Sequence, residues 1–142
     1  MHHVSEALGP CLCTALRKAS RAVTRVYDEA LHPAGMTTVQ FAILRHIARA
    51  ETVPLSRLAD QLVLERTSLY RTLEPLERRG WVTVAAGAGK AKLALLTPAG
   101  AAVLDSAVER WEGTQQRMTE ALGEARWAEL RTLLAETVEI AQ

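Results

Sequence analysis

The chain opens with an apolar pattern typical of an amphipathic helix. From Pro10 to Leu31, apolar residues recur at intervals of three and four, which is the spacing of one helical face. Pro10 suits the first helical position, because its missing N–H would have no partner there. The segment 32–35, His-Pro-Ala-Gly, continues a helix only at a cost. The first predicted element is therefore a helix that ends at about residue 31.

A second helix and a closely spaced helix pair are predicted next. Thr37 and Gln40 have the spacing of a capping box, which predicts a helix running to about residue 50. Two further helical stretches, 55–61 and about 65–79, are separated only by Leu-Val-Leu. Helices joined by so short a turn must cross at a steep angle. This is the helix-turn-helix geometry.

The C-terminal half predicts a β-hairpin followed by two helices. Residues 81–84 and 92–96 have strand patterns on either side of a turn rich in Gly and Ala. Thr97 caps a long helix that runs to about residue 122, and a last amphipathic helix covers 124–140. We therefore expect a mainly α fold with a small β-hairpin wing, that is, a winged helix-turn-helix flanked by N- and C-terminal helices.

Composition excludes several classes of protein. The chain has 142 residues, of which 49% are hydrophobic and 23% charged, so it is long enough to bury a core and is neither disordered nor fibrous. No uninterrupted apolar run approaches the roughly 20 residues that span a bilayer. The N-terminus lacks the basic start and apolar segment of a secretory signal. We expect a cytoplasmic protein without a membrane partner.

The net charge conceals an uneven distribution. The formal charge is only +1. Residues 1–53 contain six basic and four acidic side chains, residues 54–92 seven and four, and residues 93–142 four and eight. The positive surplus is therefore greatest in the predicted helix-turn-helix and wing. A basic lobe favours a nucleic-acid partner, although the average charge does not.

Several motifs, in this order and spacing, resemble the MarR family of bacterial transcriptional regulators. They are 55–62 (LSRLADQL), 65–71 (ERTSLYR), 76–82 (LERRGWV) and 96–100 (LTPAG), and 20–28 and 40–44 extend the match into the first two helices. The resemblance covers nearly the whole chain. It implies a homodimer whose terminal helices interdigitate and whose two lobes bind a pseudo-palindromic operator in double-stranded DNA. We expect one domain, 1–142, with the DNA-binding lobe at 37–97 and the dimerisation region at 10–34 and 98–142.

Two positions depart from the family pattern. The wing of the family usually carries Asp-x-Arg, where this chain has Ala88 and Lys90. Lys lacks the planar fork of Arg, so this wing should bind DNA more loosely. Pro75 falls within the predicted recognition helix, where it removes one backbone hydrogen bond.

The candidate DNA contacts follow from the motif. The second helix of a helix-turn-helix enters the major groove with its N-terminal residues, where Arg bonds guanine and Ser, Thr or Tyr meet bases or phosphates. Free N–H groups at the start of the preceding helix bind phosphate. The predicted contacts are Ser56, Arg57, Arg66, Thr67, Ser68, Tyr70, Arg71 and, in the wing, Lys90. Alternatively, Arg66 and Arg71 pair with nearby carboxylates on a solvated helix face.

Two cysteines near the N-terminus are candidate redox sensors. Cys11 and Cys13 are predicted in the first helical turn, where the helix dipole favours the reactive thiolate. On one helix they point about 200° apart, which disfavours a disulfide between them. The alternative is that a free Cys near a packing surface is simply a small buried hydrophobe.

The family resemblance adds a specific role for Cys13. It occupies the position of the reactive cysteine in the organic-hydroperoxide-sensing branch, and Tyr27 matches one of the two tyrosines that bond that sulfur. The second tyrosine position holds Thr38. Cys13 and Tyr27 are about 21 Å apart along one helix, so the partner subunit must supply the tyrosine. The other candidate effector is a small ligand such as a phenol.

No catalytic or metal-binding pattern is present in the sequence. His2, His3, His32 and His46 do not have the spacing of a metal site, and no nucleophile triad or phosphate-binding glycine motif occurs. We therefore expect no cofactor and no enzymatic activity. The predicted function is a dimeric DNA-binding regulator, acting as a repressor that a ligand or cysteine oxidation releases. The alternative is a winged-helix protein-interaction module without specific DNA binding, which the altered wing favours.

Overall fold

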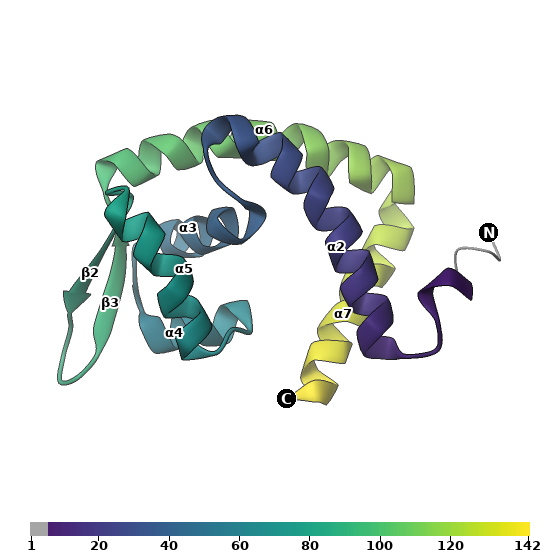
Figure 1. The fold of residues 1–142 in the computed structure, drawn as a ribbon, viewed down its shortest axis with the longest axis horizontal. Coiled ribbons are helices and arrows are strands. Elements are labelled where there is room, and N and C mark those ends of the chain that lie inside the picture. Colours follow the sequence, from purple (N-terminus) through teal and green to yellow (C-terminus); the bar gives the residue numbers. More distant parts are fainter. Residues whose placement is uncertain (1–5) are drawn as a thin grey trace.

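The structure, a computed structural model, describes residues 6–142 and confirms the expected winged helix-turn-helix class. Figure 1 shows the long helix α6 along one side, the lobe of α3–α5 and the strands beneath its N-terminal half, and α2 and α7 beneath its C-terminal half. The elements are α2 (Leu12–Leu31), η1 (His32–Ala34), α3 (Thr38–Ala50), β1 (Thr52–Pro54), α4 (Leu55–Leu62), α5 (Arg66–Arg78), β2 (Val82–Ala86), β3 (Lys92–Leu96), α6 (Pro98–Leu122) and α7 (Glu124–Ala141).

Helix α3 forms the centre of the lobe. The predicted capping box is confirmed, since the Thr37 hydroxyl accepts from the Gln40 N–H at 3.2 Å and the Gln40 side chain accepts from the Thr37 N–H at 3.0 Å. Four apolar side chains of α3 are buried: Phe41, Ile43, Leu44 and Ile47. Burial of each contributes about 1.5–3 kcal/mol relative to exposure, so this helix anchors the elements that surround it.

The wing is larger than the predicted hairpin. A third strand, β1, pairs antiparallel with β3, so the strand order is β1-β3-β2. The hydrophobic pattern did not reveal β1, because it has three residues and ends in Pro54, which cannot donate to a ladder and is tolerated at an edge. β1 places the start of α4 beside the wing.

Trp81 lies outside the strand in which it was predicted. Gly80 has a φ of 76°, and the Trp81 N–H donates to the Leu76 carbonyl at 3.0 Å, so both residues complete the C-terminus of α5. The ladder of β2 therefore begins at Val82. Helix α5 itself continues through Pro75 as one helix.

The first helix begins later than predicted. Gly9 has a φ of 75°, and α2 starts at Leu12 with Cys11 as an extended N-cap whose carbonyl accepts from the Ala15 N–H at 2.9 Å. Pro10 therefore precedes the helix instead of occupying its first position, because the extended backbone of Cys11 separates it from the helical residues. The predicted end of the helix is confirmed, with η1 closed by Gly35 at a φ of 78°.

Helix α6 is held against the beginning of the wing. The Thr97 side chain accepts from the Gly100 N–H at 3.0 Å, and the Thr97 N–H donates to the Trp81 carbonyl at 3.0 Å. The two backbones approach so closely that a Cβ on Gly100 would lie 2.0 Å from the Trp81 carbonyl oxygen. Position 100 therefore requires glycine for close packing, although its φ is ordinary.

Replacing Gly100 with alanine should destabilise the fold by about 3 kcal/mol, because the backbone of α6 must move away from Trp81. Gly113→Ala is the matched control, since a Cβ there meets nothing within 4 Å of the protomer. It should stabilise α6 by about 1 kcal/mol. Chemical unfolding of both variants at one protein concentration measures the two effects. Equal stability of the two variants would contradict the close approach.

Candidate nucleic-acid interface

Helices α4 and α5 form the predicted helix-turn-helix. The turn passes through Val63, which has a φ of 55° and donates its N–H back to α4. A β-branched residue is rare in this left-handed region, where non-glycine residues cost roughly 1–2 kcal/mol. Burial of apolar side chains from both helices, Leu58, Ala59, Leu69, Leu73 and Leu76, holds the turn in this conformation. These buried side chains form the inward face of the helix pair.

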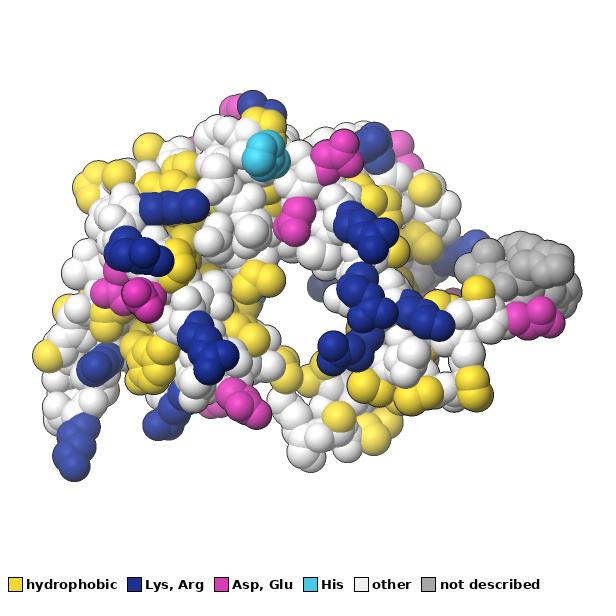
Figure 2. All heavy atoms as spheres, in the orientation of Figure 1, with side chains coloured by type: hydrophobic (Ala, Val, Ile, Leu, Met, Phe, Trp, Pro, Cys, Tyr) yellow, Lys and Arg dark blue, Asp and Glu magenta, His cyan; other side chains and the backbone are white. Residues whose placement is uncertain are grey.

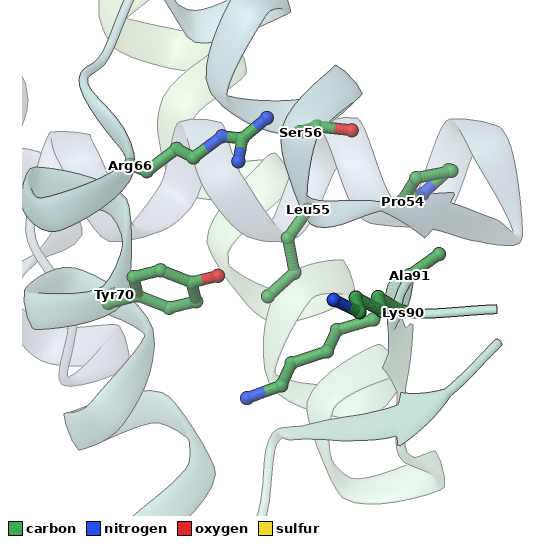
Figure 3. A pocket seen from close by; sticks show the side chains of 8 residues that line it. Pro54, Leu55, Ser56, Arg66, Tyr70, Lys90 and Ala91 are labelled. Carbon is green, nitrogen blue, oxygen red and sulfur yellow. The ribbon is translucent and has the colours of Figure 1, made fainter.

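Four of the predicted contact residues converge on one recess. A recess of about 260 Å³ is lined by Ser56 from α4, Arg66 and Tyr70 from α5, and Lys90 from the wing. Figure 3 shows the Arg66 guanidinium and the Tyr70 hydroxyl pointing into it from the same side. Pro54 precedes α4 and gives no side-chain cap, so the first N–H groups of that helix are available to an anion.

The remaining predicted residues lie on the same helices but outside the recess lining. Arg57 is exposed on α4, and Thr67, Ser68 and Arg71 are exposed on α5. Lys92 also lines the recess, together with Leu55 and Ala91. The sequence favours Lys90 over Lys92 as the wing contact, and the structure places both at the recess.

Arg66 and Arg71 of α5 have no carboxylate partner on their own helix. Within residues 6–142, the one ion pair joins Arg78 to Glu74 at 3.9 Å, and both side chains are exposed. Arg66 and Arg71 therefore lack the carboxylate partners that the solvated-face alternative required. Figure 2 shows Lys and Arg side chains gathered over α5 and the wing. The surface is suited to a polyanion.

The cysteines are exposed at the start of α2. Cys11 is the N-cap of α2 and Cys13 lies in its first turn, so the 200° separation, which assumes two helical residues, does not apply to this pair. Hydrogen bonds from the Thr14 side chain, and from the Thr14 and Cys13 backbone, lower the pKa of the Cys11 thiol. The exposure of both thiols also differs from the buried-hydrophobe alternative.

Tyr27 links two helices within one protomer. Its hydroxyl donates to the Gln115 side chain of α6, and burial raises the pKa of the Tyr27 phenol. The adjacent Asp28 carboxylate accepts from the Thr38 N–H at 2.7 Å and from the Thr38 hydroxyl at 2.6 Å. Thr38, which occupies the second tyrosine position, thus ties α3 to α2.

A broad apolar surface lies where α2, α6 and α7 meet. It surrounds a cavity of about 470 Å³ with an almost wholly apolar lining, to which the Tyr27 and Gln115 side chains also contribute. Helix α7 has no buried residue in the protomer. The apolar side chains that α2 and α7 expose are Leu12, Leu16, Val23, Leu130, Leu133, Leu134, Val138 and Ile140.

No group of three or more His, Cys, Asp or Glu residues in the described part of the chain is placed to hold a metal ion. His2 and His3 lie outside the described residues. No helix among residues 6–142 has the length and apolar character to cross a membrane.

Comparisons with known proteins agree with this geometry. Residues 36–100 match the winged helix DNA-binding domain family. The chain is similar to the M. tuberculosis transcriptional regulator MosR in complex with DNA, with 38% identity, a TM-score of 0.86, and coverage of 93% of this chain and 96% of MosR. A comparison with curated protein sequences finds no match.

The MarR protein of E. coli is a more distant relative. A mutant MarR in complex with operator DNA has 26% identity and a TM-score of 0.79, covering 89% of this chain and 92% of that one. Apo wild-type MarR has 25% identity and a lower TM-score of 0.70, covering 90% and 97%. These relatives are DNA-binding regulators and not enzymes. By its match to MosR over nearly the full length of both proteins, and by its winged helix-turn-helix, the chain belongs to the MarR family of transcriptional regulators.

Proposed function

We propose that the chain is a homodimeric repressor that binds a pseudo-palindromic operator in double-stranded DNA and is released by a small ligand or by cysteine oxidation. The observation that carries the proposal is the recess where Ser56, Arg66, Tyr70 and Lys90 converge from three elements. These side chains combine cationic and neutral hydrogen-bond donors on one exposed surface. Such a set suits phosphates and base edges together.

In this proposal α5 enters the major groove. Arg66, Thr67, Ser68 and Arg71 lie in its first two turns and face solvent, while Leu69 and Leu73 hold its other side in the core. Ser56 and Arg57 at the start of α4 contact phosphate, and Lys90 follows from the wing. Two lobes must lie about 34 Å apart to reach successive major grooves on one side of the duplex.

The conformation of the protomer supports a DNA-bound arrangement. The TM-score is 0.79 against the operator complex of MarR and 0.70 against its apo form. Residues of the last turn of α2 hold this arrangement, because Tyr27 binds α6 and Asp28 binds the first turn of α3. An effector that changes the angle between α2 and the lobe would change the spacing of the two recognition helices.

A second copy of the chain is the proposed occupant of the apolar surface on α2 and α7. Isolated helices of this length are marginal in water, so α7 needs an apolar partner that its own protomer supplies only in part. Exposed apolar surface that continues over two helices and a cavity is typical of an interface. Its extent also fits the interdigitated dimer that the family resemblance implies.

The oxidation route rests on the N-terminal cysteines. Cys11 has an exposed thiol with a lowered pKa, which favours the thiolate that reacts with peroxide. Cys13 remains the position that matches the sensing branch of the family. The ligand route rests on the apolar cavity, where Tyr27 and Gln115 offer a polar edge to a phenolic compound.

Arg71→Ala should weaken operator binding by about 1–3 kcal/mol for each half-site, because a bidentate contact to a base or phosphate is lost. Fluorescence anisotropy with DNA from upstream of the chain's own gene measures this loss. Arg110→Ala on α6 removes an equal charge far from α5 and should change the affinity little. If wild type shows no salt-sensitive binding and Arg71→Ala is indistinguishable from it, the protein-interaction alternative replaces the proposal.

Leu134→Asp should dissociate the dimer, because it places a charge on the apolar surface of α7. An uncompensated buried charge costs about 3 kcal/mol or more, which raises the dimer dissociation constant by about 100-fold. Thr132→Asp adds the same charge at a neighbouring exposed position and should leave the dimer intact. Sedimentation velocity across a dilution series distinguishes the two variants. A monomeric wild type would reject the proposed interface.

Cys11→Ser should slow the release of operator DNA by cumene hydroperoxide. Because its pKa is lowered, Cys11 stays thiolate to a lower pH than an ordinary thiol, and its reactivity falls as the pH falls through that pKa. Release is measured by anisotropy between pH 6 and 8 in wild type, Cys11→Ser, Cys13→Ser and the double variant. Unchanged release in the double variant would exclude both cysteines and favour the ligand route.

A further inference from the structure

Helix α2 carries a second basic surface that the recognition helix does not account for. Its members, which we call the α2 stripe, are Arg17, Lys18, Arg21 and Arg25. All four side chains are exposed. The three arginines follow one another at intervals of four residues, so they lie along one side of the helix over about two turns.

The stripe has little internal compensation. No Asp or Glu occurs in α2 before Asp28, and no member forms an ion pair within the described part of the chain. Lys18 donates to the Ala7 carbonyl at 2.9 Å, which leaves its charge in place. Like charges four residues apart destabilise a helix by about 0.2–0.5 kcal/mol per pair. Such an arrangement is favourable when an external polyanion neutralises it.

The stripe lies on the side of α2 away from the proposed dimer interface. The α2 residues that line the apolar cavity include Leu16, Ala19 and Val23, which cluster about 180° from the centre of the stripe at 100° per residue. A second copy packed on the apolar side therefore leaves the stripe in solvent. The acidic C-terminal helices of the second copy are therefore less suited to neutralise the stripe than a molecule outside the dimer.

The stripe shares one face of the molecule with the recognition surface. Figure 2 shows Lys and Arg side chains over α2 on the same side as those over α5 and the wing, across a central opening. A rigid polyanion that lies on α5 extends beyond a single lobe, because a half-site repeat is about 34 Å long. We propose that the α2 stripe contacts the phosphate backbone of the operator duplex next to the half-site that α5 reads.

This inference rests on the proposed DNA binding and assigns to α2 an affinity role without sequence readout. Phosphate contacts release counterions, and each adds about 0.9 to the steepness of the dependence of log K on log salt. A dimer carries six stripe arginines. If three of them each neutralise one phosphate, α2 contributes about 3 units to the slope of log K against log salt. Discrimination between operator sequences should not depend on them, since phosphate carries no base information.

The test is the triple variant Arg17→Gln, Arg21→Gln and Arg25→Gln, with anisotropy measured from 50 to 300 mM KCl on the upstream duplex and on a scrambled duplex. We expect affinity for both duplexes to fall by about tenfold or more at 100 mM, the salt slope to flatten by about 2–3 units, and the ratio of the two affinities to stay constant. Hydroxyl-radical footprinting should lose protection beside the half-sites and keep it within them.

A matched control removes the same charge from the acidic helices. The control variant combines three substitutions at exposed positions of α6 and α7, namely Arg110→Gln, Arg126→Gln and Arg131→Gln. It should leave the salt slope of DNA binding unchanged. An α2 variant that behaves like this control overturns the inference, as does one that dissociates the dimer while each remaining dimer binds DNA normally. Failure of the proposed function itself is distinguishable, because wild type would then show no binding that Arg71→Ala diminishes.

Discussion

The packing of one central helix against four other helices and two strands is the constraint on which the rest of this structure depends. Helix α3 packs against α2, α4, α5, α6 and two strands, and its apolar side chains Ile43, Leu44 and Ile47 have no exposed surface. An interior this closely packed transmits displacement instead of absorbing it. The recognition helix, the wing and the long helix consequently have their positions fixed through a common neighbour.

Polar and aromatic contacts then orient α3 relative to the helices outside the lobe. Asp28 places a carboxylate at the positive end of α3, and Arg45 of α3 lies 4.3 Å above the ring of Trp111 on α6, which itself stacks on Phe41 at 5.9 Å. The contacts reach α3 at its first turn and near its middle. A change in either would rotate the lobe as a body, which is the kind of movement that separates two recognition helices.

Much of the fold could be predicted from the sequence, because the decisive interactions there are local. Helix caps such as Thr37 act over three residues, and the spacing of Leu69, Leu73 and Leu76 gives the buried face of α5 directly. The three-residue strand β1 has no such periodicity, and the extended backbone of Cys11, which places the start of α2 at Leu12, leaves no periodic signal either. The recess joins segments about 35 residues apart, and the Tyr27–Gln115 bond joins residues 88 positions apart. Spacing rules contain no information on contacts of that range.

The absence of any buried residue in α7 has a consequence for how the protein is controlled in the cell. If this helix completes its packing only against a second copy, folding of the C-terminal region and assembly are one equilibrium, which depends on protein concentration. The population able to occupy an operator then rises with the square of the free chain concentration at low abundance. Synthesis rate would act as a threshold, so that a modest fall in expression empties the operator even when no effector is present.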